Sequence, residues 1–434
     1  MAKGREKRFT KTEWSWILYD WANSVYPTNI MAAIFPILYS QVAGSGTLGD
    51  HLYGYAVSLA NLFVALLSPY LGAIADFRGM KKKLWTGFML TGVIFTAVMG
   101  VVGSWKLMLI GFVISRIGFS GSCMFYDSFL TDVTTPDRMD KVSAWGFAMG
   151  YIGGSTIPFV ISIVIMFLMN MSELSMRIAV LIVPVWWLIF SLPFYRNVRQ
   201  VSYVDTPPAE LGKAAWKNTV KTFQNILKNK AILFFLLAYF FYIDGVDTII
   251  SMATKYGNTL GLGQIGMILA LVVTQIVAVP CSIFFGKYAE KVGALKLITF
   301  AVLLYAFITI LGFAMGYIVD FHESLNMTLE RAVGISQVLF WILATLVGTV
   351  QGGIQALSRS YYGKLIPAER SGEYYGFMDI FGKFACVIGP ALYELFYGIT
   401  GKPCFGILSI ILLFICGFLF LTIGKKHFRT AEHE

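Results

Sequence analysis

The sequence predicts an all-α membrane protein with twelve transmembrane helices arranged as two six-helix pseudo-repeats. Hydrophobic residues make up 57% of its 434 residues and charged residues only 13%, whereas soluble domains carry about 25% charged residues. Twelve apolar runs each reach the roughly 20 residues that a membrane helix requires. A short signature around Asp76 also returns around Glu290, six runs later. Together these observations leave no room for a large soluble catalytic domain.

The apolar runs are separated by short polar connections. We expect spans at 14–41, 51–75, 84–103, 106–130, 142–169, 176–195, 230–255, 264–287, 296–319, 333–359, 374–399 and 404–424. The first run follows basic residues, as a secretory signal would, but it is too long for one and contains Asp20. We therefore interpret it as a retained helix.

The positive charges predict the orientation in the membrane. Of the 34 Lys and Arg residues, 27 fall in segments that are cytoplasmic if the amino terminus is inside, and 5 fall in outer segments. Because cytoplasmic loops retain basic residues, both termini are expected inside, most simply in the plasma (inner) membrane. The net charge of +10 then reflects topology, and a nucleic-acid partner is not expected.

The repeated signature predicts an internal duplication. Each copy has a glycine, an acid four residues later, a glycine three residues after that, and then basic residues. The positions are Gly72, Asp76, Gly79, Lys81 and Lys82 in the first copy and Gly286, Glu290 and Gly293 in the second. Paired repeats are common in secondary transporters, so we expect halves at 1–195 and 230–434.

A polar segment, 196–229, joins these halves. It predicts an amphipathic helix with two stripes, Trp216, Val220, Phe223 and Leu227 on one face and Lys213, Lys217 and Lys221 on another. Such a helix is suited to lie along the inner membrane surface. A role as a tether between the halves is preferred over a regulatory role.

The first copy of the signature resembles the cytoplasmic loop signature of the major facilitator superfamily, with Met80 where a basic residue is usual. The runs Trp16–Ser24, Tyr242–Thr248 and Gly352–Ser360 resemble the branch that contains the vacuolar amino-acid effluxers of fungi and their bacterial relatives. The resemblance implies a transporter of the major facilitator fold, with helices one, four, seven and ten around a central cavity. It also implies a cytoplasmic gate at the two signature copies, to which we add Asp127 and Arg359.

Charged side chains inside the membrane cost about 2.5–3.5 kcal/mol even on insertion scales, so each calls for a partner, a wet cavity or a function. In the first span Asp20, Asn23 and Pro27 share a face. Asp20 is a candidate for substrate or proton binding, and equally for a cap or ion pair at the inner end. Asn23 and the nearby Tyr26 are candidate substrate ligands.

The fourth span carries Arg116 near mid-depth. Its guanidinium keeps its proton and offers several donors, so it suits a carboxylate or phosphate on the substrate. A permanent pair with a buried acid is the structural alternative.

The seventh span carries Asp244 and Asp247, followed by Thr248, Ser251 and Lys255 on one face. Two acids one turn apart repel, and in a low-dielectric site one of them keeps a proton. This makes the pair the first choice for proton coupling, with neutralisation by Lys255 or Arg116 as the alternative. Tyr242 is a candidate substrate ligand beside them.

The tenth and eleventh spans carry the remaining candidates. Gln351 and Gln355 could bind a polar solute or bond neighbouring helices. Asp379 and Lys383, at i and i+4, are suited to pair with each other, although opening that pair could be a coupling step. We therefore keep Asp379 as a proton site and Lys383 as a substrate ligand.

No nucleotide-binding, hydrolase or metal-ligand motif occurs in the sequence, so no enzyme and no cofactor is expected. The first hypothesis is a monomeric, proton-coupled secondary transporter in membrane lipid that moves a small polar solute, with an amino acid or similar zwitterion as first choice. The alternatives are efflux of amphiphilic or cationic compounds and a membrane sensor without transport.

Overall fold

The computed structural model describes residues 8–44, 48–205 and 210–431, so part of the basic start and residues 206–209 of the linker lie outside the described residues. By its internal contacts the chain divides into two compact units, one of residues up to Phe223 with Ile366–Ile380, and one of Gln224–Leu365 with residues from Phe381 onward. The halves expected from the repeat stay a prediction.

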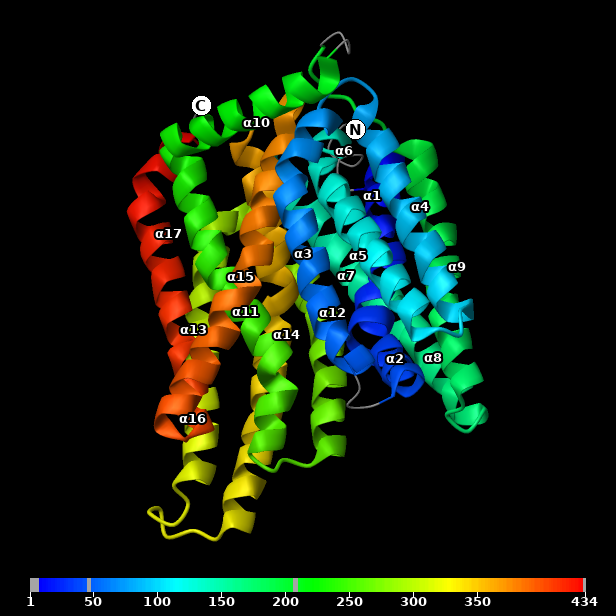
Figure 1. The fold of residues 1–434 in the computed structure, drawn as a ribbon. Coiled ribbons are helices and arrows are strands. Elements are labelled where there is room, and N and C mark those ends of the chain that lie inside the picture. Colours follow the sequence, from blue (N-terminus) through cyan, green and yellow to red (C-terminus); the bar gives the residue numbers. More distant parts are fainter. Residues whose placement is uncertain (1–7, 45–47, 206–209, 432–434) are drawn as a thin grey trace. The chain divides into compact units, whose positions relative to one another are not determined.

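The first unit is built almost entirely from helices (Figure 1). In chain order they are α1 (Lys11–Asn23), the π-helix η1 (Pro27–Ala33), α2 (Ile34–Ala43), α3 (Leu48–Ala75), α4 (Met80–Val101), α5 (Trp105–Ser128), α6 (Leu130–Val133), α7 (Met139–Met149), the π-helix η2 (Gly150–Thr156), α8 (Ile157–Leu168), α9 (Glu173–Asn197) and most of α10 (Leu211–Lys228). The 3-10 turn η4 (Ala368–Arg370) and the first ten residues of α15 (Ser371–Thr400) complete this unit.

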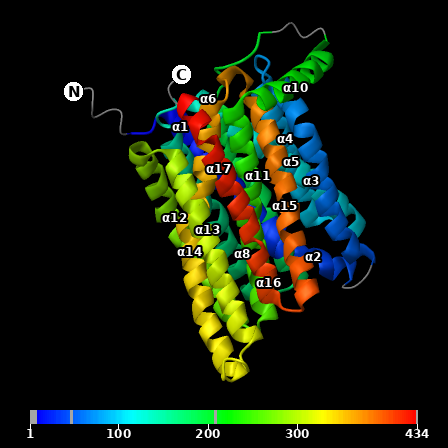
Figure 2. The ribbon, with the colours of Figure 1, turned by 90° about the vertical axis from the view of Figure 1, so that its left-hand side faces the viewer.

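The second unit contains the remaining helices. They are α11 (Lys230–Thr259), α12 (Gln264–Val292), α13 (Ala294–Asp320), α14 (Leu329–Leu365), the rest of α15, α16 (Pro403–Ser409) and α17 (Ile411–Ala431). Within it α14 packs against both α12 and α13, and α17 packs against α11. Figure 2 shows α13 and α14 running side by side to the turn that joins them.

The prediction of an all-α membrane protein is confirmed. Among the described residues, eleven helices are long and apolar enough to cross a membrane, and they match the expected spans from the second to the twelfth. The first expected span is divided into α1, η1 and α2. Pro27 begins the π-helical segment, because proline cannot donate to the helical ladder, and a second π-helix interrupts the fifth span.

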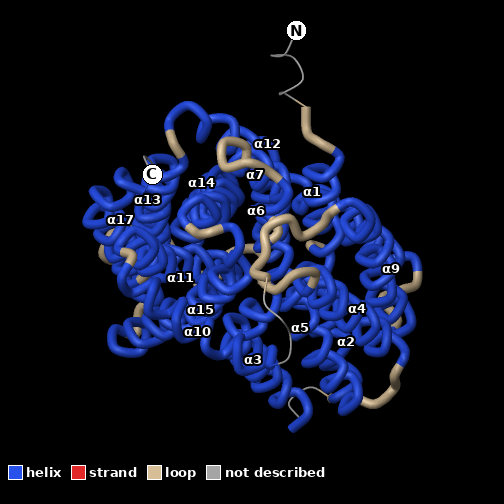
Figure 3. Tube along the Cα trace, turned by 90° about the horizontal axis from the view of Figure 1, so that it is seen from above, coloured by secondary structure: helices blue, strands red, loops and turns tan. Residues whose placement is uncertain are grey.

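Aromatic side chains form the core of the first unit. Trp16, Trp85 and Trp187 are fully buried and belong to one hydrophobic cluster. Seen end-on, α5 lies beside α3 and α4 (Figure 3). A smaller cluster of Ala73, Phe77 and Ala215 attaches α10 to the end of α3. This packing brings the linker helix beside the first copy of the repeated signature.

Candidate functional site

The first copy of the signature forms a turn between α3 and α4. Gly79 has a positive φ of 73°, a conformation that glycine adopts without strain. A Cβ on Gly72 would lie 2.1 Å from the carbonyl oxygen of Gly372, so only glycine permits the close approach of α3 to the start of α15. The glycines therefore position this turn.

Asp76 caps the start of α15. Its two carboxylate oxygens accept hydrogen bonds from the backbone N–H groups of Gly372 at 2.7 Å and Glu373 at 2.9 Å. The first N–H groups of a helix have no partner within it and attract negative charge. Burial nevertheless raises the pKa of Asp76 to about 8, against the opposing influence of Lys81 and of the two N–H donors. Protonation of Asp76 is therefore accessible near neutral pH.

Lys81 belongs to the same cluster. Its ammonium donates to Asp132 at 2.8 Å and to the Ser371 hydroxyl at 2.7 Å, and the side chains of Lys81 and Asp132 are both fully buried. Asp132 also accepts from the backbone N–H groups of Val201 and Ser202. Lys82, in contrast, is half-buried and donates to the carbonyl of Val198 at 2.9 Å. The sequence had not linked Asp132 to the signature.

The second copy of the signature, around Glu290, differs from the first in the burial of its acid. Gly293 has a positive φ of 94° at the end of α12, as Gly79 has between α3 and α4. Gly286 is buried, but Glu290 is exposed, whereas Asp76 is buried. Asp127 is half-buried and Arg359 is buried. A gate role for these residues stays a prediction.

Two candidate residues of the first unit, Asp20 and Tyr26, form hydrogen bonds with side chains of α5. Asp20 accepts a hydrogen bond from the Tyr126 hydroxyl at 2.8 Å. Tyr26 is fully buried, accepts from Ser115 at 3.0 Å and stacks on Phe119. Such contacts favour a structural role for Tyr26.

Two other candidates in this unit differ in their surroundings. The side-chain N–H of Asn23 is buried and finds no hydrogen-bond partner among the described residues, so it has donor capacity to spare. Arg116 is half-buried, and its Nε donates to Asn61 on α3 at 3.0 Å. Asn61 is a partner that the sequence had not indicated.

Asp379, in the third turn of α15, is half-buried and accepts a hydrogen bond from the Ser68 hydroxyl on α3 at 2.5 Å. Lys383 is also half-buried. Glu394, further along α15, forms an ion pair with Lys255 of α11 at a partly exposed position. Lys255 is thus engaged by Glu394. Neutralisation of the seventh-span acids by Lys255 or Arg116 stays a prediction.

Asp244 is the most deeply buried of the acids that the structure describes in the second unit. Both of its carboxylate oxygens lie 3.0 Å from the backbone nitrogen of Gly389 on α15, and the Thr248 hydroxyl donates to one of them at 3.3 Å. A Cβ on Gly389 would lie 1.9 Å from the Thr248 hydroxyl oxygen, so glycine is required there. The sequence signal for this contact is the Gly389-Pro390 pair within an apolar span.

The described residues give Asp244 only neutral hydrogen-bond donors. The side chain is fully buried, and burying a carboxylate without a positive partner is expensive. Asp247, one turn away, is half-buried, and Ser251 and Lys255 are exposed. On this face of α11, Asp244 and Thr248 are therefore buried, whereas Ser251 and Lys255, nearer the end of the helix, are exposed.

The run Gln355–Ser360 on α14 contacts α11. The hydroxyls of Tyr242 and Ser358 share a hydrogen bond of 2.6 Å, and both side chains are fully buried. Gln355 is half-buried. The most specific sequence motif of the second half therefore joins the helix that carries Asp244.

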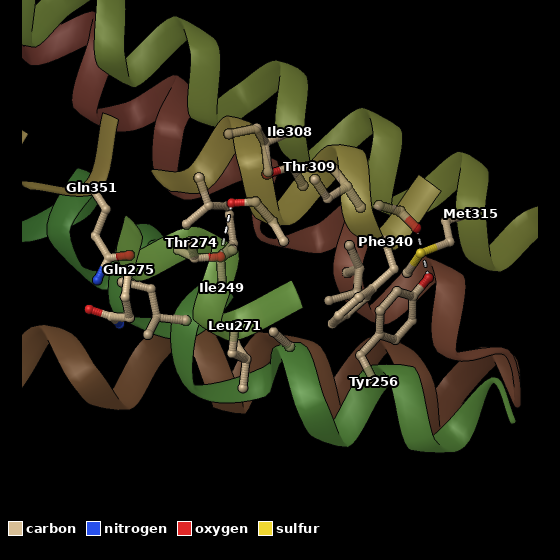
Figure 4. A pocket seen from close by; sticks show the side chains of 17 residues that line it. Ile249, Tyr256, Leu271, Thr274, Gln275, Ile308, Thr309, Met315, Phe340 and Gln351 are labelled. Atoms are coloured by element: carbon tan, nitrogen blue, oxygen red, sulfur yellow. Dashed lines mark hydrogen bonds between the residues drawn. The ribbon is translucent and has the colours of Figure 1, made fainter. Parts of the chain in front are cut away.

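A cavity of about 110 Å³ lies between α11, α12, α13, α14 and α16. Its walls are mainly aliphatic, and its polar side chains are Tyr256, Thr274, Gln275, Thr309 and Gln351. Figure 4 shows Gln275 and Gln351 toward one end and Tyr256, Phe340 and Met315 toward the other. The volume exceeds the 10–15 Å³ or so that one water requires, and is sufficient for a small solute.

The glutamines are the polar groups of this cavity that remain able to bind a ligand. Tyr256 donates to the carbonyl of Gly312, and Thr274 donates to the carbonyl of Ala344. The side-chain oxygen of Gln275 is buried and has no partner among the described residues. Gln351 was expected from the sequence, whereas Gln275 was not. Asp244, Tyr242, Gln355 and Lys383 do not line this cavity.

A family model described as "Vacuole effluxer Atg22 like" matches residues 50–427. An uncharacterized MFS-type transporter, YxiO, of Bacillus subtilis (strain 168) is 40% identical over 436 residues, which cover 98% of this chain and 97% of the relative. Autophagy-related protein 22-2 of Aspergillus clavatus is 26% identical over 287 residues, 63% of this chain and 46% of the fungal protein.

Solved structures share the fold. The MFS proton:xylose symporter XylE, bound to 6-bromo-6-deoxy-D-glucose, has a TM-score of 0.70 at 12% identity, with 95% of each chain covered. FucP, a major facilitator superfamily transporter in the outward conformation, has a TM-score of 0.66 at 13% identity, covering 95% of this chain and 98% of that one. The expected fold is thereby confirmed.

Proposed function

This chain belongs to the Atg22-like vacuole effluxer family of major facilitator transporters, and from that premise we propose that it moves a small polar solute, most simply an amino acid or similar zwitterion, in exchange or company with protons. The two repeated halves would alternate access, with both termini in the cytoplasm. Asp244 would carry the proton, in concert with Asp247.

The observation that carries this proposal is the environment of Asp244. A buried carboxylate held by one backbone N–H and one hydroxyl changes its energy strongly when it gains or loses a proton, because no positive charge in the described part of the chain bonds to it. A reversible protonation at this position can be coupled to movement of α11 against α15. The zwitterion is a first choice because acids can meet its ammonium and Arg116 its carboxylate.

Counterflow in proteoliposomes tests the substrate. The panel contains amino acids, sugars and peptides, and we expect exchange of at least one zwitterion. If no zwitterion exchanges while another solute does, the substrate class is wrong and the transport role remains.

A second measurement tests the coupling. We expect Asp244→Asn to keep counterflow and to lose pH-driven accumulation at least about tenfold, the effect of about 1.4 kcal/mol. Glu394→Gln is the matched control, because this acid is partly exposed and already paired. Full accumulation in both Asp244→Asn and Asp247→Asn would contradict the assignment.

The cavity supports a second candidate function, efflux of amphiphilic compounds. Its aliphatic walls and two glutamines suit a ligand with a large apolar part and one polar end. If amphiphiles, but no amino acid, shift the thermal unfolding of the purified protein, this candidate replaces the first.

A further inference from the structure

The linker helix α10 has one face that is buried. Ala215 and Thr222 are fully buried, and Ile226 is 2% exposed. Ala215 packs against Ala73 and Phe77 at the end of α3. This face is held by the protein and determines how α10 is rotated about its own axis.

A second face of α10 is apolar and exposed. The exposed fractions are 63% for Trp216, 43% for Val220, 47% for Phe223 and 50% for Leu227. These residues follow helical steps of four, three and four, so they form a continuous stripe along one side. Since the packed face is elsewhere, the stripe is available to a partner that is apolar.

A third face of α10 is basic. Lys213, Lys217 and Lys221 recur every four residues and are all exposed. Lys213 forms a surface ion pair with Glu210, and the two side chains are 81% and 66% exposed. Exposed pairs of this kind are weak. The positive stripe lies beside the apolar stripe, about a quarter turn away at 100° per residue.

The packed face of α10 also contacts the cluster around Asp76. The Thr222 hydroxyl donates to a carboxylate oxygen of Glu373 at 2.8 Å, and the backbone N–H of the same Glu373 donates to Asp76 at 2.9 Å. Phe223, although it belongs to the exposed stripe, also stacks on Phe377, one turn further along α15. A movement of α10 would therefore alter the contacts of the first turns of α15.

We propose that α10 is a binding site for anionic lipid headgroups and that its attachment to the bilayer surface steadies the first turns of α15. The apolar stripe would insert at the boundary between headgroups and acyl chains, and the lysines beside it would contact phosphate groups. Amphipathic surface helices adopt this arrangement. The occupant is an anionic bilayer surface because three regularly spaced positive charges border an exposed apolar stripe. A second copy of the chain, or a protein partner, would not require that combination of faces.

Hydrogen exchange of the full chain in nanodiscs tests this proposal. One set of discs contains phosphatidylcholine alone, and the other an equal mixture with phosphatidylglycerol. We expect amide exchange in 211–228 to be at least about tenfold slower in the anionic discs, since three lysines that each contribute about a fivefold gain in binding together contribute about a hundredfold. Exchange in 371–378 should slow with it, and added salt should reduce both effects.

Three variants distinguish the binding of lipid by α10 from its effect on the first turns of α15. Lys213→Gln/Lys217→Gln/Lys221→Gln should abolish the lipid response of both segments. The control Lys287→Gln/Lys291→Gln/Lys426→Gln removes three exposed charges from other helices and should retain it. Thr222→Val should keep the response of 211–228 and reduce that of 371–378.

Two outcomes would overturn the proposal. One is equal exchange in both kinds of disc, and the other is an unchanged lipid response in the α10 triple variant. Protection that follows protein concentration, and is the same in both lipids, would assign the face to a second copy instead.

Discussion

Both carboxylate oxygens of Asp244 lie 3.0 Å from the backbone nitrogen of Gly389. The contact joins two membrane-spanning helices, α11 and α15, at a point where no side chain fits between them. It makes the proposed proton site sensitive to the separation of these helices, because a backbone donor moves only when its helix moves.

The first prediction concerns Gly389→Ala. The added methyl group would lie 1.9 Å from the Thr248 hydroxyl oxygen and 2.8 Å from Asp244, so the helices must separate. We expect the free energy of unfolding to fall by about 1–3 kcal/mol, as in other overpacked cores, measured by thermal unfolding in detergent. Gly398→Ala, on the same helix with nothing within 4 Å of its Cβ, should change little. Equal effects at both positions would contradict the packing argument.

The second prediction concerns the buried ion pair of Lys81 and Asp132. Removing one member leaves an unpaired buried charge, so Lys81→Met should destabilise the protein by about 3–5 kcal/mol. Lys81→Met/Asp132→Leu should recover part of that loss, which a double-mutant cycle measures. The control is Lys213→Met, whose partner Glu210 is exposed and whose loss should change stability by about 0–1 kcal/mol. An additive cycle at Lys81 and Asp132 would refute the coupling.

The third prediction concerns Asp76 and pH. Its pKa in the folded protein is about 8, against an ordinary value of 3.8. A carboxyl group with a raised pKa binds its proton more tightly when folded, so its contribution to stability is full below pH 4 or so and falls as the pH rises to about 8. Between pH 5 and 9 the thermal midpoint of the wild type should therefore fall more than that of Asp76→Asn. Parallel curves for the two proteins would show that Asp76 titrates normally.

The fourth prediction concerns the cavity of the second unit. Gln351→Leu removes a polar group at one end, so it should weaken binding of a polar solute about tenfold, the loss expected of roughly one hydrogen bond. The readout is the solute concentration that half-saturates the thermal shift, with the solute found by counterflow. Thr345→Val is the control, because Thr345 lies on the same helix but is exposed. If both variants bind alike, the solute does not occupy this cavity.

The fold follows from the sequence because lipid restricts the choices. Backbone groups in hydrocarbon must be bonded within their own segment, so apolar runs of sufficient length become helices. Pro27 also indicated the place where the first span is interrupted. The interruption is a π-helix of seven residues, Pro27–Ala33, which packs against η2 and α9. The spacing of residues within the span does not predict that form.

The site was predicted less completely. A rare charge in an apolar run identified Asp244, since each such residue needs a reason to be there, and the repeated signature identified Asp76. Their partners are backbone N–H groups of Gly389, Gly372 and Glu373, and a backbone donor leaves no mark in the composition. Gln275 was missed because one glutamine in an apolar helix has an ordinary structural explanation.

By itself the sequence determined the helices, their order, the duplicated signature and the short set of acids that deserve mutation, because these depend on the local cost of polar groups in lipid. Only the tertiary structure decided which acid meets which donor. Asp76 caps α15 about 300 residues away in the chain, and Lys255 of α11 pairs with Glu394 of α15, 139 residues further along. Such contacts depend on how helices distant in sequence approach one another, and spacing along one helix does not contain that information.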